Sequence, residues 1–353
     1  MKKIGKMFLA VLAVALMNPF AGSAATIPET LEKADQLMAE VIAETGLKKG
    51  DPNLLVLTNA GYGTINGEST EAFLDSARDK TGCSPGIRSL LAIHTSVEEP
   101  LWCSVYRKHT GKVVFFKWTG EDFHRQTMDA SPASILSPEG WKKAASGLIG
   151  GRIFSVISIS LTWAADPPWP LLHAATFHDH FCPGLNSGYI AGLHLIEKMP
   201  LQAGDRYVFV TAPGKCAADA LQVMFNTTAG KSSGYSMAMD GKTLAEYSSG
   251  KIRPATIAMR VNKKADRCEG VVLGFDWGKA YEVIGVKPGE MAPEGGPADP
   301  MFWIARVKMS RGLAGLPKPQ LLEYIVELKS FSGKASLADR IAAGNPYSVI
   351  LNQ

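Results

Sequence analysis

The densest group of metal-binding side chains in this sequence lies between Phe177 and Gly184. His178, His180 and Cys182 alternate along it, and in an extended backbone alternate residues project to the same side. Imidazole and thiolate together suit zinc, and also copper or iron. The following Pro183 prevents a helix from running through the cysteine. The segment therefore predicts a metal site on the approach to a helix.

A second reactive segment is centred on Cys216, where a predicted strand ends, a Pro-Gly turn follows and a helix begins. Unpaired backbone N–H groups at a helix start favour the thiolate form of a cysteine, as does the neighbouring cation Lys215. Asp219 and Gln222 follow at intervals of three residues, on the same helix face as Cys216. These side chains are therefore candidates for one shared site.

The order of these segments resembles a known family. The residues that carry the resemblance are His178-Asp179-His180-Phe181-Cys182-Pro183-Gly184-Leu185, then Cys216-Ala217-Ala218-Asp219-Ala220-Leu221-Gln222, with Thr228-Ala229-Gly230-Lys231 and Asp240-Gly241-Lys242 further along. Together they resemble the FmdE family, which is named after formylmethanofuran dehydrogenase. The resemblance covers about Leu171 to Phe275, roughly a third of the chain. The family's name comes from operon context and does not define an activity for stand-alone members.

The resemblance implies an α+β domain, often dimeric, with a metal site. Its ligands here are His178, His180, Cys182 and Cys216, with Asp219 as a further ligand or as a group that orients one, and zinc is the default metal. The chain departs from the family pattern because Asp179 replaces the usual glycine between the histidines and no Cys-x-x-Cys pair follows. The zinc-finger tail of longer members is therefore not expected.

Other roles for these residues stay open. Lys231 and Lys242 are candidate contacts for a small anionic ligand or metallocofactor. Asp179 either orients an imidazole or is a solvated loop residue. As an alternative to metal binding, the histidines cap a helix end while Cys182 and Cys216 form a disulfide, which an oxidising compartment favours.

The first residues predict export. Lys2, Lys3 and Lys6 precede an apolar run too short to span a bilayer, and small residues follow, so we expect a signal peptide over residues 1–25, cut after Ala24 or Ala25, and a periplasmic or secreted protein. The full sequence has 37 basic and 33 acidic residues. Without the three leader lysines, 34 basic residues remain, so the charge is nearly neutral. That balance argues against a nucleic-acid partner, and no later segment predicts a transmembrane helix.

The remaining cysteines are interpreted separately. Five cysteines cannot all pair with one another, so at least one is free, metal-bound or paired with another molecule. We expect Cys83 and Cys103 to form a structural disulfide and Cys268 to be a free thiol in a charged turn. The isolated histidines are assigned structural or surface roles: His94, His109 and His124.

Hydrophobic periodicity predicts two α+β units, each with a sheet and flanking helices, joined by a Pro-rich connector at 166–170. The expected elements of the first unit are helices over 26–46, 69–80 and 86–94 and strands over 54–57, 101–106, 112–118 and 153–163. Those of the second are helices over 171–177, 185–198 and 217–227 and strands over 207–211, 256–261 and 270–275, followed by one more strand and a helix over 319–328. The expected divisions are a signal peptide (1–25), an N-terminal α+β domain (26–165), an FmdE-like domain with a mixed sheet (166–290) and a C-terminal extension packing on both (291–353).

The functional expectation is an exported, FmdE-like metal protein with no assigned catalytic residue. Phosphate-binding, metalloprotease and hydrolase motifs are absent from the sequence. One alternative is a carrier of a metal or metallocofactor for an exported redox enzyme, with the N-terminal domain docking the partner. A second alternative is a thiol-redox protein that uses Cys182 and Cys216.

Overall fold

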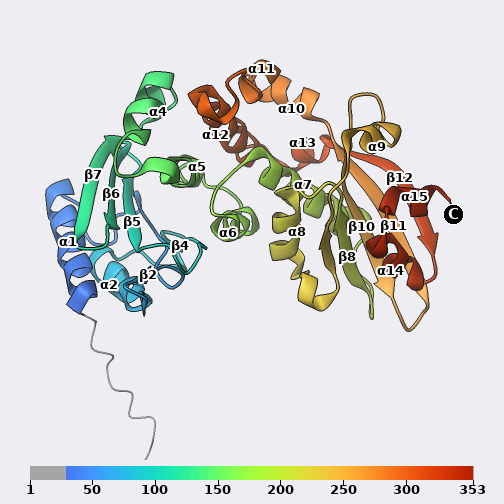
Figure 1. The fold of residues 1–353 in the computed structure, drawn as a ribbon, viewed down its shortest axis with the longest axis horizontal. Coiled ribbons are helices and arrows are strands. Elements are labelled where there is room, and N and C mark those ends of the chain that lie inside the picture. Colours follow the sequence, from blue (N-terminus) through green and yellow to red (C-terminus); the bar gives the residue numbers. More distant parts are fainter. Residues whose placement is uncertain (1–28, 353) are drawn as a thin grey trace, which may run out of the picture.

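Two mixed sheets separated by a layer of helices make up this protein in the computed structural model, which describes residues 29–352. Helices also cover the outer face of each sheet, which gives five layers in all (Figure 1). The predicted α+β class is confirmed. The expected signal peptide lies outside the described residues. In the described part of the chain, none of the helices combines the length and apolar character that crossing a bilayer requires.

The first sheet has the strand order β4-β1-β5-β6-β7. Only β1 and β4 pair in parallel, and the predicted hairpin of β5 and β6 is confirmed. Alternate residues of β1 enter two different cores, Leu54 and Val56 on one face and Leu55 and Leu57 on the other, which explains its uninterrupted apolar run. The strands are β1 Leu54–Thr58, β4 Leu90–Ala92, β5 Trp102–Arg107, β6 Lys112–Trp118 and β7 Phe123–Asp129, with a separate short pair of β2 Thr64–Ile65 and β3 Glu68–Ser69.

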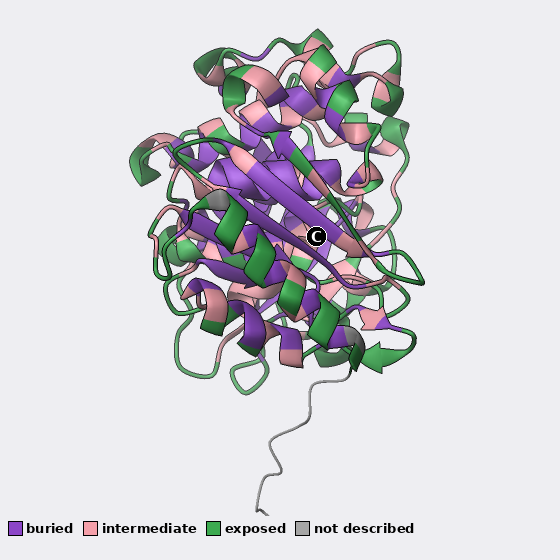
Figure 2. Ribbon diagram, turned by 90° about the vertical axis from the view of Figure 1, so that its left-hand side faces the viewer, coloured by how far each residue is buried: buried purple, intermediate pink, exposed green. Residues whose placement is uncertain are grey.

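Helix α1 (Glu29–Thr45) and helix α2 (Ala72–Thr81) cover the outer face of this sheet. The predicted apolar face of α1 is buried there, and Figure 2 shows its exposed outer face in front of the buried strands. Asp35 of α1 joins the two helices, because it accepts a hydrogen bond from Ser76 and its Oδ2 lies 2.9 Å from the Nζ of Lys80.

Asp35 is expected to make a pH-dependent contribution to stability. Burial raises the pKa of its carboxyl group, but Lys80 and Ser76 outweigh burial, so the pKa is lowered on folding. A lowered folded-state pKa stabilises the protein above the unfolded pKa, and the effect is lost as pH falls through the folded pKa. Asp35→Asn should therefore lower the free energy of unfolding by about 1 kcal/mol near neutral pH. Urea unfolding at several pH values should show this difference shrinking in acid, and a constant difference would contradict it.

The segment Ile153–Trp163 is a helix, α5, so the predicted strand is wrong. Every residue from Ile153 to Thr162 is buried, which means that the helix has no solvent-facing stripe and its alternating serines and isoleucines mimic a strand pattern. Two of the serines, Ser155 and Ser158, are satisfied by backbone groups of the loop that follows α6. These serines therefore make buried hydrogen bonds and do not form a solvent-exposed polar face.

Helices α5, α6, α7, α8 and α12 meet between the two sheets (Figure 1). Helix α12 packs against both α5 and α7, and α8 packs against α6 and α7. The predicted helices over 171–177, 185–198 and 217–227 are confirmed, whereas α12 was not predicted. Helices α3, α4, α10 and α11 contribute to the same core. The bounds are α3 Pro132–Ile135, α4 Pro138–Ala145, α6 Trp169–His178, α7 Pro183–Lys198, α8 Ala217–Phe225, α10 Trp277–Ile284, α11 Pro288–Met291 and α12 Pro300–Ala314. The division at 166–170 stays a prediction, and the helices on either side of it share one core.

The second sheet has the strand order β12-β11-β10-β8-β9, with only β8 and β9 in parallel. Helices α7 and α8 cover its inner face, and the C-terminal helices α14 and α15 cover its outer face. The bounds are β8 Arg206–Thr211, β9 Gly234–Ser236, α9 Gly241–Glu246, β10 Pro254–Asn262, β11 Arg267–Phe275, α13 Lys318–Leu322, β12 Ile325–Gly333, α14 Ser336–Ala343 and α15 Pro346–Leu351.

Two predicted helices are wrong. Residues 86–94 form a turn followed by β4, because Arg88 adopts a positive φ and the apolar run after it pairs with β1. The helix predicted over 319–328 ends as α13 at Leu322, because the residues from Ile325 onward extend and pair with β11. In both cases pairing with a neighbouring strand overrides local helical spacing.

The expected Cys83–Cys103 disulfide is also wrong, since both residues are free thiols in the core of the first sheet. The Cys83 thiol donates to the Leu54 carbonyl oxygen at 3.7 Å. Burial raises the pKa of both thiols, so they remain protonated and pack as small apolar groups. Cys268 is free as expected, but it is buried in β11 rather than placed in a turn.

Candidate metal centre

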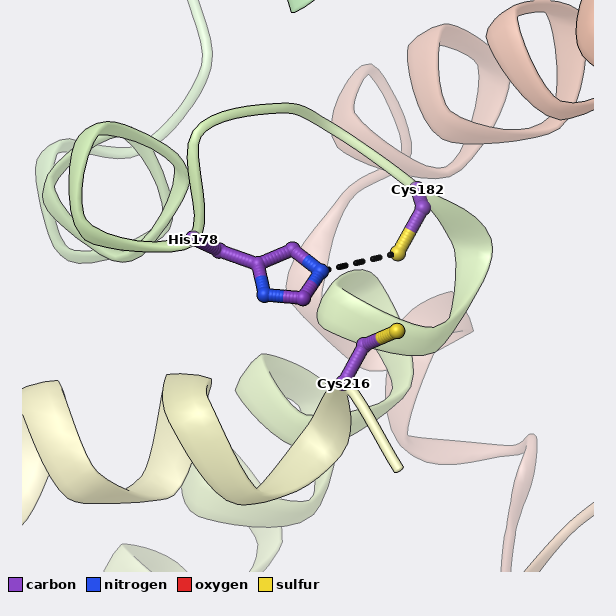
Figure 3. Close-up of side chains that lie close together, drawn as sticks. All are labelled: His178, Cys182 and Cys216. Atoms are coloured by element: carbon purple, nitrogen blue, oxygen red, sulfur yellow. Dashed lines mark hydrogen bonds between the residues drawn. The ribbon is translucent and has the colours of Figure 1, made fainter. Parts of the chain in front are cut away.

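Three side chains from three helix ends form the candidate metal centre. His178 is the last residue of α6, Cys182 immediately precedes α7, and Cys216 immediately precedes α8. The Nε2 of His178 lies 3.6 Å from the Sγ of Cys182, and the three ligand atoms all lie within 4.8 Å of one another (Figure 3). The sequence prediction that the two motifs meet is therefore confirmed for these three residues.

The turn between α6 and α7 brings His178 and Cys182 to the same side. Asp179 ends α6 in a left-handed conformation with φ of 67°, which an aspartate tolerates better than most residues. Cys182 is extended, and its sulfur accepts a hydrogen bond from the Leu185 N–H at 3.3 Å. Pro183 occupies the first position of α7, where the missing N–H has no helical partner to lose.

Helix α5 holds this turn in place. Ser155 donates a hydrogen bond to the Asp179 carbonyl oxygen, and Ser158 accepts one from the Phe181 N–H at 3.1 Å. Arg152, just before α5, lies 3.2 Å from the Asp179 carboxylate. The helix that replaces the predicted strand is therefore a direct support for the residues between the two candidate ligands.

Asp219 contacts His178 on the side away from the two thiols. Its Oδ2 lies 2.7 Å from the Nδ1 of His178, which leaves Nε2 to face Cys182. A carboxylate in this position fixes the orientation of a metal-binding imidazole and makes it a better donor. Of the two roles considered for Asp219, the geometry favours orienting a ligand.

His180 lies beside the cluster, but outside the group of donor atoms within 4.8 Å found among the described residues. Its ring centroid is 4.3 Å from that of His178 and 4.9 Å from that of Phe154. Its Nδ1 is 2.5 Å from the Asp179 carboxylate, so Asp179 does orient an imidazole. The two histidines therefore lie side by side as predicted, but only His178 is close enough to both thiols to share a metal with them.

The charges of the cluster are strongly coupled. Burial acts to lower the pKa of His178, but hydrogen bonds to Asp219 and Cys216 outweigh it and raise the pKa to about 9. The hydrogen bond with Cys182 lowers the pKa of Cys216 to about 4, with a further contribution from His178. That same hydrogen bond, together with burial, raises the pKa of Cys182. Without a metal, the group therefore holds one thiolate, one thiol and one imidazolium near neutral pH.

The cluster fits zinc in donor type and spacing. Zinc binds thiolate sulfur at about 2.3 Å and imidazole nitrogen at about 2.0–2.1 Å. In a tetrahedral arrangement those lengths separate the two donor atoms by roughly 3.5 Å, which matches the 3.6 Å between His178 and Cys182. Gly184 permits this approach, since an added Cβ there would lie 3.1 Å from the Cβ of Cys216 and 3.7 Å from the Sγ of Cys182.

The two predicted anion contacts lie apart from the cluster. Lys231 donates a hydrogen bond to the side chain of Asn226, and Lys242 is exposed on α9. Neither lysine lines the two cavities that border Cys216 in the described part of the chain. One cavity, of about 380 Å³, has His178 and Asp219 among its lining residues. The other, of about 470 Å³, is lined in part by residues of α10 and α12 that sequence analysis missed, because no spacing links them to the ligands.

The fold and the cluster define an α+β domain with a His/Cys/Cys group that could bind a metal. Residues 177–270, about a quarter of the chain, match the FmdE family model, which is described by the molybdenum formylmethanofuran dehydrogenase operon. This FmdE domain overlaps the second sheet and contains all three cluster residues. No curated protein matches the chain.

Close packing of α7 on α8 is expected to set the separation of the two thiols. An added Cβ at Gly188 of α7 would lie 2.4 Å from the carbonyl oxygen of Ala217. Gly188→Ala should therefore push α8 away from α7, lower the free energy of unfolding by about 1–3 kcal/mol and weaken the binding of added zinc to the cluster. Gly241→Ala is a matched control, since no atom of the described residues lies within 4 Å of its added Cβ. Equal stability and zinc affinity in both variants would contradict this packing argument.

Proposed function

We propose that this protein is an exported zinc protein in which His178, Cys182 and Cys216 supply three ligands and a fourth coordination position is open to a small ligand. The observation that carries the proposal is the convergence of the three donor atoms within 4.8 Å of one another, next to a cavity. Three protein ligands with an open position are typical of zinc sites that act on a bound molecule, whereas structural zinc sites have four.

The surrounding residues support binding rather than a purely structural role. When bound, zinc would supply Lewis acidity toward an oxygen or nitrogen donor. Asp219 orients the His178 imidazole, and the Arg152–Asp179 ion pair holds the turn between the ligands. His180 borders the same cavity as the two thiols, so it is placed to contact a bound ligand.

Substitution of zinc by Co²⁺ tests the open position. The visible absorption of a cobalt–thiolate site reports its coordination number and its ligands. We expect thiocyanate to change the spectrum of the cobalt protein, because it can enter the fourth position. A cobalt spectrum that thiocyanate leaves unchanged would indicate four protein ligands, and it would overturn the proposal of an open site while leaving metal binding intact.

Export is proposed from the sequence alone, because the signal peptide lies outside the described residues. Zinc-thiolate chemistry in an oxidising compartment requires that Cys182 and Cys216 be held by metal rather than by a disulfide. The mass of the protein recovered from the exported fraction should correspond to removal of the first 24 or 25 residues. Recovery of an unprocessed protein from the cytoplasm would contradict export.

A further inference from the structure

A cavity of about 470 Å³ opens beside the two thiols and is shaped by parts of the chain outside the FmdE domain. Cys182 and Cys216 line it from inside the domain, whereas α5, α10, α11 and α12 line it from outside. Figure 1 shows α10, α11 and α12 arching over α7, which begins at the metal cluster. The volume falls within the range of roughly 300–1,000 Å³ that is usual for small-molecule sites.

Four of the six residues that line the cavity from outside the domain are aromatic. Phe154 has its ring centroid 4.9 Å from that of His180 and 4.8 Å from that of Trp303. Trp277 and Tyr281 of α10 form a second pair, with centroids 6.1 Å apart. All of these side chains line the cavity, and all but Phe154 are only partly buried. Partly covered aromatic rings around a cavity suit a flat, apolar ligand body.

The same cavity is positively charged. It is lined by Lys215, Lys251, Arg253 and Arg306, and no aspartate or glutamate is among its lining residues in the described chain. Arg306 is held in place, because it donates to the carbonyl oxygens of Met291 and Phe302 at 2.9 and 2.7 Å. Burial lowers the pKa of the Arg306 guanidinium, whereas charge interactions with Cys182 and Cys216 raise it. Arg306 is therefore close enough to the two cysteines to interact with their charge.

We propose that this cavity binds a planar aromatic molecule that carries a carboxylate or phosphate group, with the ring against the tryptophans and the anionic group among the cations beside the metal. The proposal rests on the proposed zinc site, since it names the class of molecule that the open position would serve. A neutral aromatic compound lacks the charge that four cations attract, and a simple anion lacks the surface that the rings cover.

Calorimetric titration of the zinc-loaded protein tests this assignment with simple probes. The probes are 2-naphthoate, 2-naphthyl phosphate, neutral 2-naphthamide, acetate and inorganic phosphate. We expect one or both aromatic anions to bind saturably, and the stronger of them identifies the acidic group. The neutral amide, acetate and phosphate should each bind at least about tenfold more weakly. Equal binding of the amide or of the simple anions would overturn the assignment.

A double variant, Lys251→Gln with Arg253→Gln, tests the cations without disturbing the interior, because both side chains are exposed. It should weaken the aromatic anion at least about fivefold and leave zinc content and naphthamide binding unchanged. Lys242→Gln is the matched control, an exposed lysine that does not line the cavity. Equal binding in both variants would overturn the assignment. Zinc is measured on the same samples. A protein that contains no zinc but still binds the aromatic anion would contradict the proposed zinc site and leave the proposed aromatic-anion site intact.

Discussion

Replacing Cys216 with alanine is expected to abolish zinc retention. Cys216 is the one thiol of the cluster whose pKa is lowered, to about 4, and it supplies a ready thiolate. The total free energy of zinc binding to a protein site is on the order of 10 kcal/mol or more, and every ligand contributes to it. Two protein ligands should therefore lose zinc during dialysis that three would retain. We expect zinc to fall from about one atom per chain to less than about a tenth, measured by elemental analysis after dialysis. Cys182→Ala and His178→Ala should behave in the same way.

Cys268→Ala is the matched control for the loss of a thiol. Cys268 is buried in β11, where burial raises its pKa to about 11, and it takes no part in the cluster. This variant should retain zinc. His180→Ala should also retain it, since His180 lies outside the group of three donors. Zinc retention by the Cys216 variant, or its loss from the Cys268 variant, would contradict the assignment.

Replacing Asp219 with asparagine is expected to weaken zinc binding by about 10- to 100-fold without abolishing it. The Asp219 carboxylate lies 2.7 Å from the Nδ1 of His178, so its charge both orients the imidazole and makes Nε2 a better donor. Asparagine keeps the size and one acceptor oxygen but removes that charge. Competition with a chromophoric chelator measures the change in affinity.

An exposed carboxylate on α2, Asp75, provides the control for Asp219→Asn. Asp75→Asn removes the same charge far along the chain from the cluster and should leave zinc affinity unchanged. Complete loss of zinc from Asp219→Asn, with the fold intact, would mean that Asp219 is itself a ligand. An unchanged affinity would mean that it contributes nothing to the site.

The candidate ligands could be predicted because their chemistry is concentrated in short segments. His178 and Cys182 are only four residues apart. Because α7 begins at Pro183, Cys182 must be the extended residue immediately before the helix. Cys216 also precedes a helix whose N-terminus is clear from the sequence. Local rules for strand ends and helix starts therefore locate all three. These local rules do not give the distances between donor atoms, and only those distances show that His180 lies outside the group formed by His178 and the two thiols.

The supports of the site could not be predicted, because they depend on tertiary contacts. Helix α5 is buried on all sides, so periodicity gives no signal that separates it from a strand, and its serines bond to the loop at 179–181. Trp303 and Arg306 reach the cavity only because α12 packs against α5 and α7. The predicted anion contacts, Lys231 and Lys242, were chosen by motif, whereas the cations that line the cavity share no motif.

The proposed metal site requires that Cys182 and Cys216 hold a metal together with His178. It is tested most directly by elemental analysis of the protein, purified from the exported fraction without oxygen or chelator, combined with a count of free thiols after denaturation. We expect near-stoichiometric zinc and five free thiols per chain once the metal is removed. Protein without metal, in which Cys182 and Cys216 are joined as a disulfide, would contradict it.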